Sequence, residues 1–274
     1  MPNATRPQWI EEHVSALQGS ASPEELAAAA AELAGSDDPE ALDAVGIFLR
    51  RSEFLDRLDE PDAPNRILNL TSVLSPLIAA PSPEVARLLL HLVDEPIYLE
   101  HDRKSLILEA LAGVVPMTAE TAEAFRRANE EGYFAYDALL LARNGSPVAL
   151  ELFRSMMGDK ELDAEARVEL MHKGIMPHRT RLAILEMVAA MLGDGLEQPV
   201  IAAAIESVFD YKTEWFTIHG PTPPAWRTAP DDVLRYVIDL GASVKAQPNL
   251  PATLLPAIEE TTAIARALLS RRSA

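Results

Sequence analysis

Apolar residues recur along the chain at the spacing that forms one face of an α-helix. Positions i, i+3, i+4 and i+7 are apolar in segment after segment, and no segment sustains a two-residue alternation. The first period indicates amphipathic helices, whereas alternation would indicate strands. We therefore predict an all-α fold without a sheet. The stripes are Val85, Leu88, Leu89 and Leu92; Ile107, Ala110, Leu111 and Val114; Ala149, Leu152, Phe153 and Met156; Ile184, Met187, Val188 and Met191; Ile201, Ala204, Ile205 and Val208; and Val233, Tyr236, Val237 and Leu240.

The predicted helix starts share one sequence pattern, in which a capping residue is followed by proline or alanine and, in most of them, by an acidic residue. Proline suits the first helical turn, because its φ is already helical and its missing N–H needs no partner there. Ser, Thr and Asp cap the free N–H groups of that turn. Further helices are predicted over 66–79, 103–115, 132–143, 165–173 and 181–192, which gives antiparallel pairs. The starts are Ser22-Pro23-Glu24, Asp38-Pro39-Glu40, Ser82-Pro83-Glu84, Thr118-Ala119-Glu120, Ser146-Pro147 and Asp163-Ala164-Glu165.

This succession of helical pairs resembles an α-solenoid of the HEAT type, in which a second helix opening with Ser-Pro-Glu or Asp-Pro-Glu packs behind a first one. The segment Leu77-Ile78-Ala79-Ala80-Pro81-Ser82-Pro83-Glu84 carries the resemblance most clearly. It covers about residues 20–211 with unevenly spaced, degenerate repeats. The resemblance implies a right-handed solenoid of roughly six to seven irregular pairs in one domain, 1–274. An irregular helical bundle is the alternative.

Charge narrows the range of partners. The chain carries 42 acidic and 24 basic residues, a net charge of −18, and residues 1–62 alone hold a balance of −10. Binding to nucleic acid requires Lys and Arg to displace counterions from phosphates, so we expect no nucleic acid and no anionic membrane as partner. An acidic surface would instead attract a basic protein. With no cysteine and no long apolar run, we expect a soluble, cytoplasmic protein.

The segment 212–229 interrupts the helical pattern with aromatic residues and prolines. Tandem prolines favour extended geometry, so we predict a loop without helix here, followed by two C-terminal capping helices within 230–272. Tryptophan and tyrosine dominate binding hot spots, which makes this segment a candidate partner-binding site. The alternative is that its aromatic residues pack over the end of the array. The candidate residues are Tyr211, Trp215, Phe216, His219 and Trp226.

A group of cationic residues follows the helix predicted over 165–173. Free N–H groups at a helix start, with arginine beside them, suit a phosphate or carboxylate, so this group is a candidate anion site. The alternative is a solvated turn whose bases pair with nearby acids. The candidates are His172, Lys173, His178, Arg179 and Arg181.

The sequence contains only weak matches to catalytic and metal-binding motifs. Glu169 and His172 have the Glu-x-x-His spacing of a carboxylate-bridged metal helix, but a di-iron bundle needs the pair twice and no second copy occurs. No nucleophile elbow or phosphate-binding glycine loop is found, so we predict no metal and no cofactor. We expect a protein-binding module or scaffold with an acidic surface that docks a basic protein or peptide. Three alternatives stay open. They are an acidic inhibitor or immunity-type protein against a basic effector, a small-molecule-binding or metal-dependent enzyme with a pocket near His172 to Arg181, and a purely structural subunit.

Overall fold

A computed structural model of the chain describes residues 7–19, 23–36, 38–50, 74, 76–77, 82–94, 101–130, 134–209 and 224–273. Their regular structure is helical, with no strand in these ranges, which confirms the all-α prediction. Consecutive helices pack in pairs. The chain divides into two compact units, Met1–Tyr133 and Phe134–Ala274. A single continuous domain therefore stays a prediction, and each unit is described by itself.

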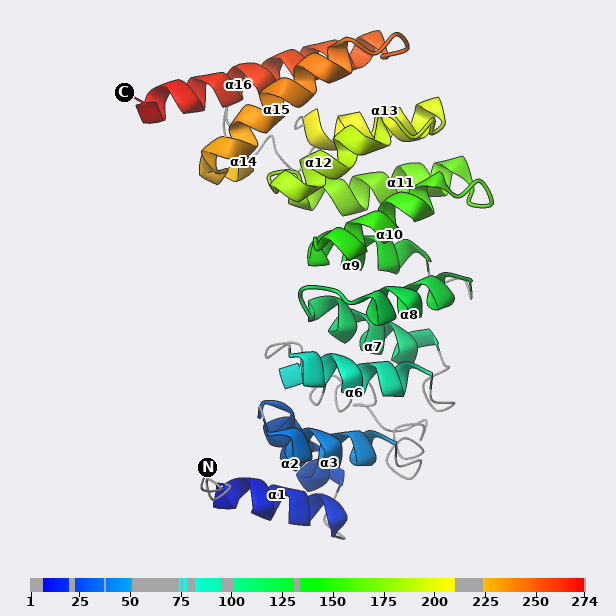
Figure 1. Cartoon of the computed structure of the whole chain (residues 1–274), viewed down its shortest axis with the longest axis vertical. Coiled ribbons are helices and arrows are strands. Elements are labelled where there is room, and N and C mark those ends of the chain that lie inside the picture. Colours follow the sequence, from blue (N-terminus) through cyan, green and yellow to red (C-terminus); the bar gives the residue numbers. More distant parts are fainter. Residues whose placement is uncertain are drawn as a thin grey trace. The chain divides into compact units, whose positions relative to one another are not determined.

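The N-terminal unit is built from short helices that contact their neighbours along the chain (Figure 1). The helices α1, α2 and α3 all contact one another, α3 also packs against α6, and α6 packs against both α7 and α8. Contacts between alternate helices therefore link α1 to α3 and α6 to α8, and a further contact links α3 to α6. The bounds are α1 Gln8–Gln18, α2 Pro23–Ala34, α3 Pro39–Leu49, α6 Pro83–Val93, α7 His101–Gly113 and α8 Ala119–Glu130.

The C-terminal unit has two rows of alternate helices. One row runs α9, α11, α13, α16, and the other runs α10, α12, α15, while α9–α10, α12–α13 and α15–α16 contact each other between the rows (Figure 1). Each helix of the two rows thus contacts the adjacent helix of its own row, and the three consecutive pairs join one row to the other. The bounds are α9 Phe134–Asn144, α10 Pro147–Gly158, α11 Ala164–Ile175, η2 Met176–His178, α12 Leu182–Met191, α13 Gln198–Phe209, α14 Pro224–Thr228, α15 Asp231–Lys245, η4 Ala252–Leu254 and α16 Leu255–Ser273.

All six predicted helix starts are confirmed, and three of them have the predicted side-chain cap. The Asp38 carboxylate accepts hydrogen bonds from two first-turn N–H groups at 3.0 and 3.1 Å. Ser82 and Thr118 each accept one at 3.1 Å. Ser146 makes no side-chain cap to α10, and its hydroxyl donates to the Asn144 side-chain oxygen at 2.6 Å. This local bond orients the hydroxyl toward the turn between α9 and α10 and away from the first helical turn.

The predicted apolar stripes form the core. Three of the six are buried throughout, and each of the others has one partly exposed member, namely Leu152, Ile201 or Tyr236. Close packing is visible at Gly174, where a Cβ atom would lie 2.7 Å from the ring of the buried Phe153. A larger residue there would have to displace that ring. Within the described ranges, no helix combines the length and apolar character needed to cross a membrane.

Two elements differ from the sequence-based expectation. Residues 224–228 form the short helix α14 inside the segment predicted as non-helical. The reason is that Pro224 occupies the first helical position, where proline is compatible with a helix. The helix α1 precedes the predicted array, which was placed from about residue 20. Its buried residues Ile10 and Leu17 are seven positions apart and lie on one helical face.

Candidate functional site

The negative charge belongs mainly to the N-terminal unit. Residues 1–133 carry 24 acidic and 10 basic residues, a balance of −14, while residues 134–274 carry 18 and 14, a balance of −4. Within the first unit, residues 7–50 hold nine acids and a single arginine, Arg50. The helices α1, α2 and α3 therefore present the densest negative charge among the described helices.

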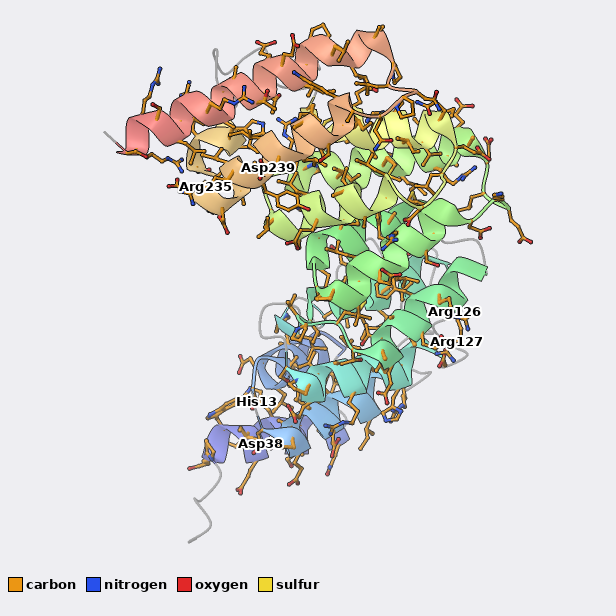
Figure 2. The ribbon with its side chains drawn as sticks, turned by 45° about the horizontal axis from the view of Figure 1, so that its top comes forward. His13, Asp38, Arg126, Arg127, Arg235 and Asp239 are labelled. Carbon is orange, nitrogen blue, oxygen red and sulfur yellow. The ribbon has the colours of Figure 1, made fainter. Side chains whose placement is uncertain are left out.

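These three helices carry exposed carboxylates and two exposed apolar side chains. Trp9 on α1 is 41% exposed and Ile47 on α3 is 64% exposed. His13, labelled in Figure 2, lies edge-on to the Trp9 indole with the two ring centroids 5.8 Å apart. When protonated, it forms an ion pair with Glu32 at 2.8 Å. We call this set the acidic N-terminal surface. Its exposed residues are Trp9, Glu11, Glu12, Glu25, Glu32, Glu40, Asp43 and Ile47.

A groove of about 300 Å³ lies between α3 and α6, next to this surface. It forms where the two helices pack closely, because a Cβ atom at Gly46 would lie 2.5 Å from a methyl group of Leu88. Asp43 and Glu84 bring carboxylates to the groove, and cationic side chains also line it. The lining residues are Pro39, Leu42, Asp43, Gly46, Arg50, Glu84, Arg87, Leu88 and His91. The sequence pattern gives no sign of this groove, because the groove depends on which helices become neighbours.

Of the five candidate partner-binding residues in the aromatic segment, the structure describes only Trp226. Tyr211, Trp215, Phe216 and His219 lie outside the described residues. Trp226 lies on α14 and is only 1% exposed, and its indole N–H finds no acceptor in the described part of the chain. Burial of this indole fits the packing alternative, and docking through the other four aromatic positions stays a prediction.

The candidate anion residues fall into two groups. His172 and Lys173 end α11 and face acids: Lys173 forms an ion pair with Glu169 at 2.5 Å, and His172 lies 3.9 Å from the Glu206 carboxylate on α13. This is the charge-paired turn that sequence analysis weighed as the alternative. Glu169 thus contacts Lys173, and among the described residues no group of three acids or histidines is arranged to hold a metal ion.

The second group gathers around the turn before α12. His178 is half-buried in η2, Arg179 is 1% exposed, and Arg181 is exposed at the N-terminus of α12. Arg181 donates to the backbone carbonyl of Arg143 at 2.7 Å, which brings α9 into the cluster. Burial, together with the smaller effect of the positive charges of Arg181 and Arg143, lowers the pKa of His178 to about 4.

His172 and Ser207 resemble a general base beside a serine nucleophile, but their hydrogen bonds point the other way. The Ser207 hydroxyl is fully buried and donates to the Ala203 carbonyl at 2.6 Å. Its contact with His172 Nδ1 at 3.0 Å must therefore be accepted by the hydroxyl oxygen. A base that activates serine has to accept the serine proton. In this arrangement the pair holds α11 against α13.

Comparison with known proteins gives no relative: no family model, no curated protein and no solved structure matches this chain.

The depressed pKa of His178 predicts a pH-dependent stability. The unfolded chain binds the proton near the ordinary value of about 6.5, whereas the folded chain binds it only near 4. The stability from keeping His178 neutral is therefore complete above about pH 6.5 and is lost as the pH falls toward 4. Thermal melts should show a smaller fall in Tm over this window for His178→Gln than for the unchanged protein. Equal falls would contradict the shift.

Proposed function

We propose that this protein is a HEAT-like helical-repeat module that binds a basic protein or peptide through its acidic N-terminal surface. The packing of alternate helices in each unit supports the repeat architecture. In a solenoid, each helical pair buries its apolar face against the next pair, so that helices in equivalent positions of successive pairs pack against each other. The rows α9–α11–α13–α16 and α10–α12–α15 follow this rule.

The observation that carries the binding proposal is the pairing of exposed apolar side chains with dense, exposed negative charge. Large exposed apolar residues such as Trp9 and Ile47 serve as anchors at protein interfaces, where tryptophan contributes disproportionately. The exposed carboxylates of the same helices would attract Lys and Arg, raise the association rate and select against acidic partners. A partner with basic residues around an apolar anchor matches both features.

Anchor variants test this surface. A labelled Lys-rich peptide with leucines at intervals is the probe, and fluorescence anisotropy of the full chain is the measurement. Trp9→Ala should weaken binding about tenfold, which corresponds to about 1.4 kcal/mol, because an interface tryptophan commonly contributes more than 1 kcal/mol. Ile47→Ala should weaken it by a smaller factor. Rising salt should steeply weaken the binding of the peptide to the unchanged protein.

Matched controls are available in the second unit. Val148 and Leu255 are also exposed apolar residues, each 38% exposed, and lie outside the acidic N-terminal surface. Their alanine variants should bind the peptide like the unchanged protein. Affinity that is indifferent to salt, or equal losses in all four variants, would argue against the proposed surface.

A further inference from the structure

A cavity of about 420 Å³ lies in the C-terminal unit, among α10, α11 and the turn between α12 and α13. Pockets that bind small molecules commonly have volumes of roughly 300–1,000 Å³, so the cavity is large enough for a small ligand. Its lining includes three basic and three acidic residues, whose charges sum to zero. They are Glu151, Arg154, Lys160, Arg167, Asp194 and Glu197.

The two arginines of this cavity differ in how carboxylates occupy their N–H donors. Arg154 donates from both Nε and Nη2 to the two carboxylate oxygens of Asp194. This is the planar fork by which a guanidinium group holds a carboxylate with two hydrogen bonds. Arg167 carries the same pair of donors, but Glu197 accepts a hydrogen bond only from Nη2, at 2.9 Å. The Nε of Arg167 finds no acceptor in the described part of the chain.

Burial makes this half-occupied fork unfavourable. Arg167 is only 2% exposed, and a buried N–H without an acceptor carries the full cost of its desolvation. Glu197 is 47% exposed, so its side chain has room to turn. Turning alone would leave the buried Arg167 cation without its partner. A carboxylate that enters the cavity and accepts from both Nε and Nη2 would fill the fork and release Glu197 at the same time.

The charge balance of the cavity decides what else such a ligand should carry. A plain carboxylate would add a fourth negative charge to the cavity and would face the Glu197 carboxylate that it displaces, which is repulsive at short range. A zwitterion adds no net charge. Its ammonium group would give the displaced Glu197 a new cationic partner, in a charge-assisted hydrogen bond.

We propose that this cavity binds a small zwitterion of the α-amino acid class. The ligand carboxylate accepts hydrogen bonds from Nε and Nη2 of Arg167, and the ligand ammonium group donates to Glu197. Lys160 adds a positive charge to the same lining and favours the carboxylate end. The site lies in the C-terminal unit, apart from the acidic N-terminal surface, and does not rest on the binding proposal above.

The test follows two NMR signals of the full chain at neutral pH: the Nε–H of Arg167 and the backbone amide of Gly195, which also lines the cavity. Glycine, N-acetylglycine and glycinamide are titrated separately at constant ionic strength. Glycine carries both charges, N-acetylglycine only the carboxylate and glycinamide only the ammonium group. We expect glycine to move both signals saturably and to bind about tenfold more tightly than either of the others, because each of them lacks one charge-assisted contact.

Substitution of Glu197 separates a ligand contact from a structural role. Glu197→Gln removes the partner of the ammonium group and also the negative charge that repels a lone carboxylate. It should therefore weaken the binding of glycine and strengthen the binding of N-acetylglycine. A purely structural Glu197 would not move the two affinities in opposite directions, so equal changes for the two probes would contradict the proposal.

A matched pair of arginine variants locates the site. Arg167→Met should abolish the glycine-dependent shift of the Gly195 signal, and it also assigns the Arg167 Nε–H signal by its loss. Arg235→Met makes the same change at an exposed position of α15 and should leave glycine binding unchanged (Figure 2). Thermal melts without ligand verify that each variant is folded. The proposal is overturned if glycine shifts neither signal saturably, if N-acetylglycine binds the unchanged protein as tightly as glycine, or if the two arginine variants respond alike.

Discussion

Replacing Trp226 with alanine is expected to destabilise the C-terminal unit by about 3–5 kcal/mol, the usual cost of removing a buried tryptophan. The side chain is 1% exposed and is the largest fully buried one in the described part of the chain. Its removal would take apolar area out of the core and leave a large cavity under α14. Urea unfolding followed by circular dichroism measures the loss. A Trp226→Phe variant, which keeps most of the apolar volume, should lose less.

The control for this change is the tryptophan at the other end of the chain. Trp9 is 41% exposed on α1, so Trp9→Ala should cost about 1 kcal/mol or less. The two variants make the same chemical change in opposite environments. If Trp226→Ala were no more destabilising than Trp9→Ala, the buried position of α14 would be wrong, and Trp226 would become available as a docking residue again.

The Glu197→Ala substitution is expected to lower the free energy of unfolding by about 2–3 kcal/mol. This loss should exceed the loss caused by replacing Arg167, the residue with which Glu197 pairs. Arg167 is 2% exposed, and its guanidinium donates to Glu197 at 2.9 Å and to the Met157 carbonyl at 3.3 Å. Its Nε finds no acceptor in the described part of the chain. A buried cation without its partner is strongly destabilising, typically by about 3–5 kcal/mol. Glu197 is 47% exposed, so the pair is partly solvated and the expected cost is lower.

The reverse change should be milder. Arg167→Met fills the same space with an apolar side chain and leaves Glu197 in water at the edge of a cavity of about 420 Å³. Its expected cost is within about 1 kcal/mol. Urea unfolding of Glu197→Ala, Arg167→Met and the double variant gives the comparison. A larger loss for Arg167→Met than for Glu197→Ala would mean that Arg167 is stabilised by its other contacts and not by this ion pair.

The helical architecture was accessible from sequence because its signals are local. Caps such as Asp38 and Ser82, and stripes such as Val85 to Leu92, depend on residues within two turns of each other. Where a second local bond competes, as at Ser146, the sequence pattern gives the correct helix and the wrong cap. The helix α1 carries the same kind of signal in Ile10 and Leu17, in a segment for which no helix was predicted.

The sites were harder to predict, because they depend on which helices become neighbours. The sequence places His172 and Lys173 close to Arg181. In the structure, however, α11 ends at Ile175, between Lys173 and Arg181, and His172 contacts Ser207 on α13. Arg143 was missed because it reaches the cluster from α9. The anchors Trp9 and Ile47 were missed for a different reason: an exposed apolar residue is recognised only after the buried ones are known.

The most direct test of the proposed function compares two quadruple variants with the same net charge. One replaces Glu11, Glu12, Glu40 and Asp43 of the acidic N-terminal surface by their amides, and the other replaces acids of the second unit, namely Glu151, Glu186, Asp232 and Asp239. Both carry −14 in place of −18, so long-range attraction to the Lys-rich peptide falls equally. If the peptide docks on the acidic N-terminal surface, the first variant should bind it at least tenfold more weakly and the second variant should show only a small change in affinity. Equal losses would show that only net charge matters and would contradict a docking surface on α1–α3.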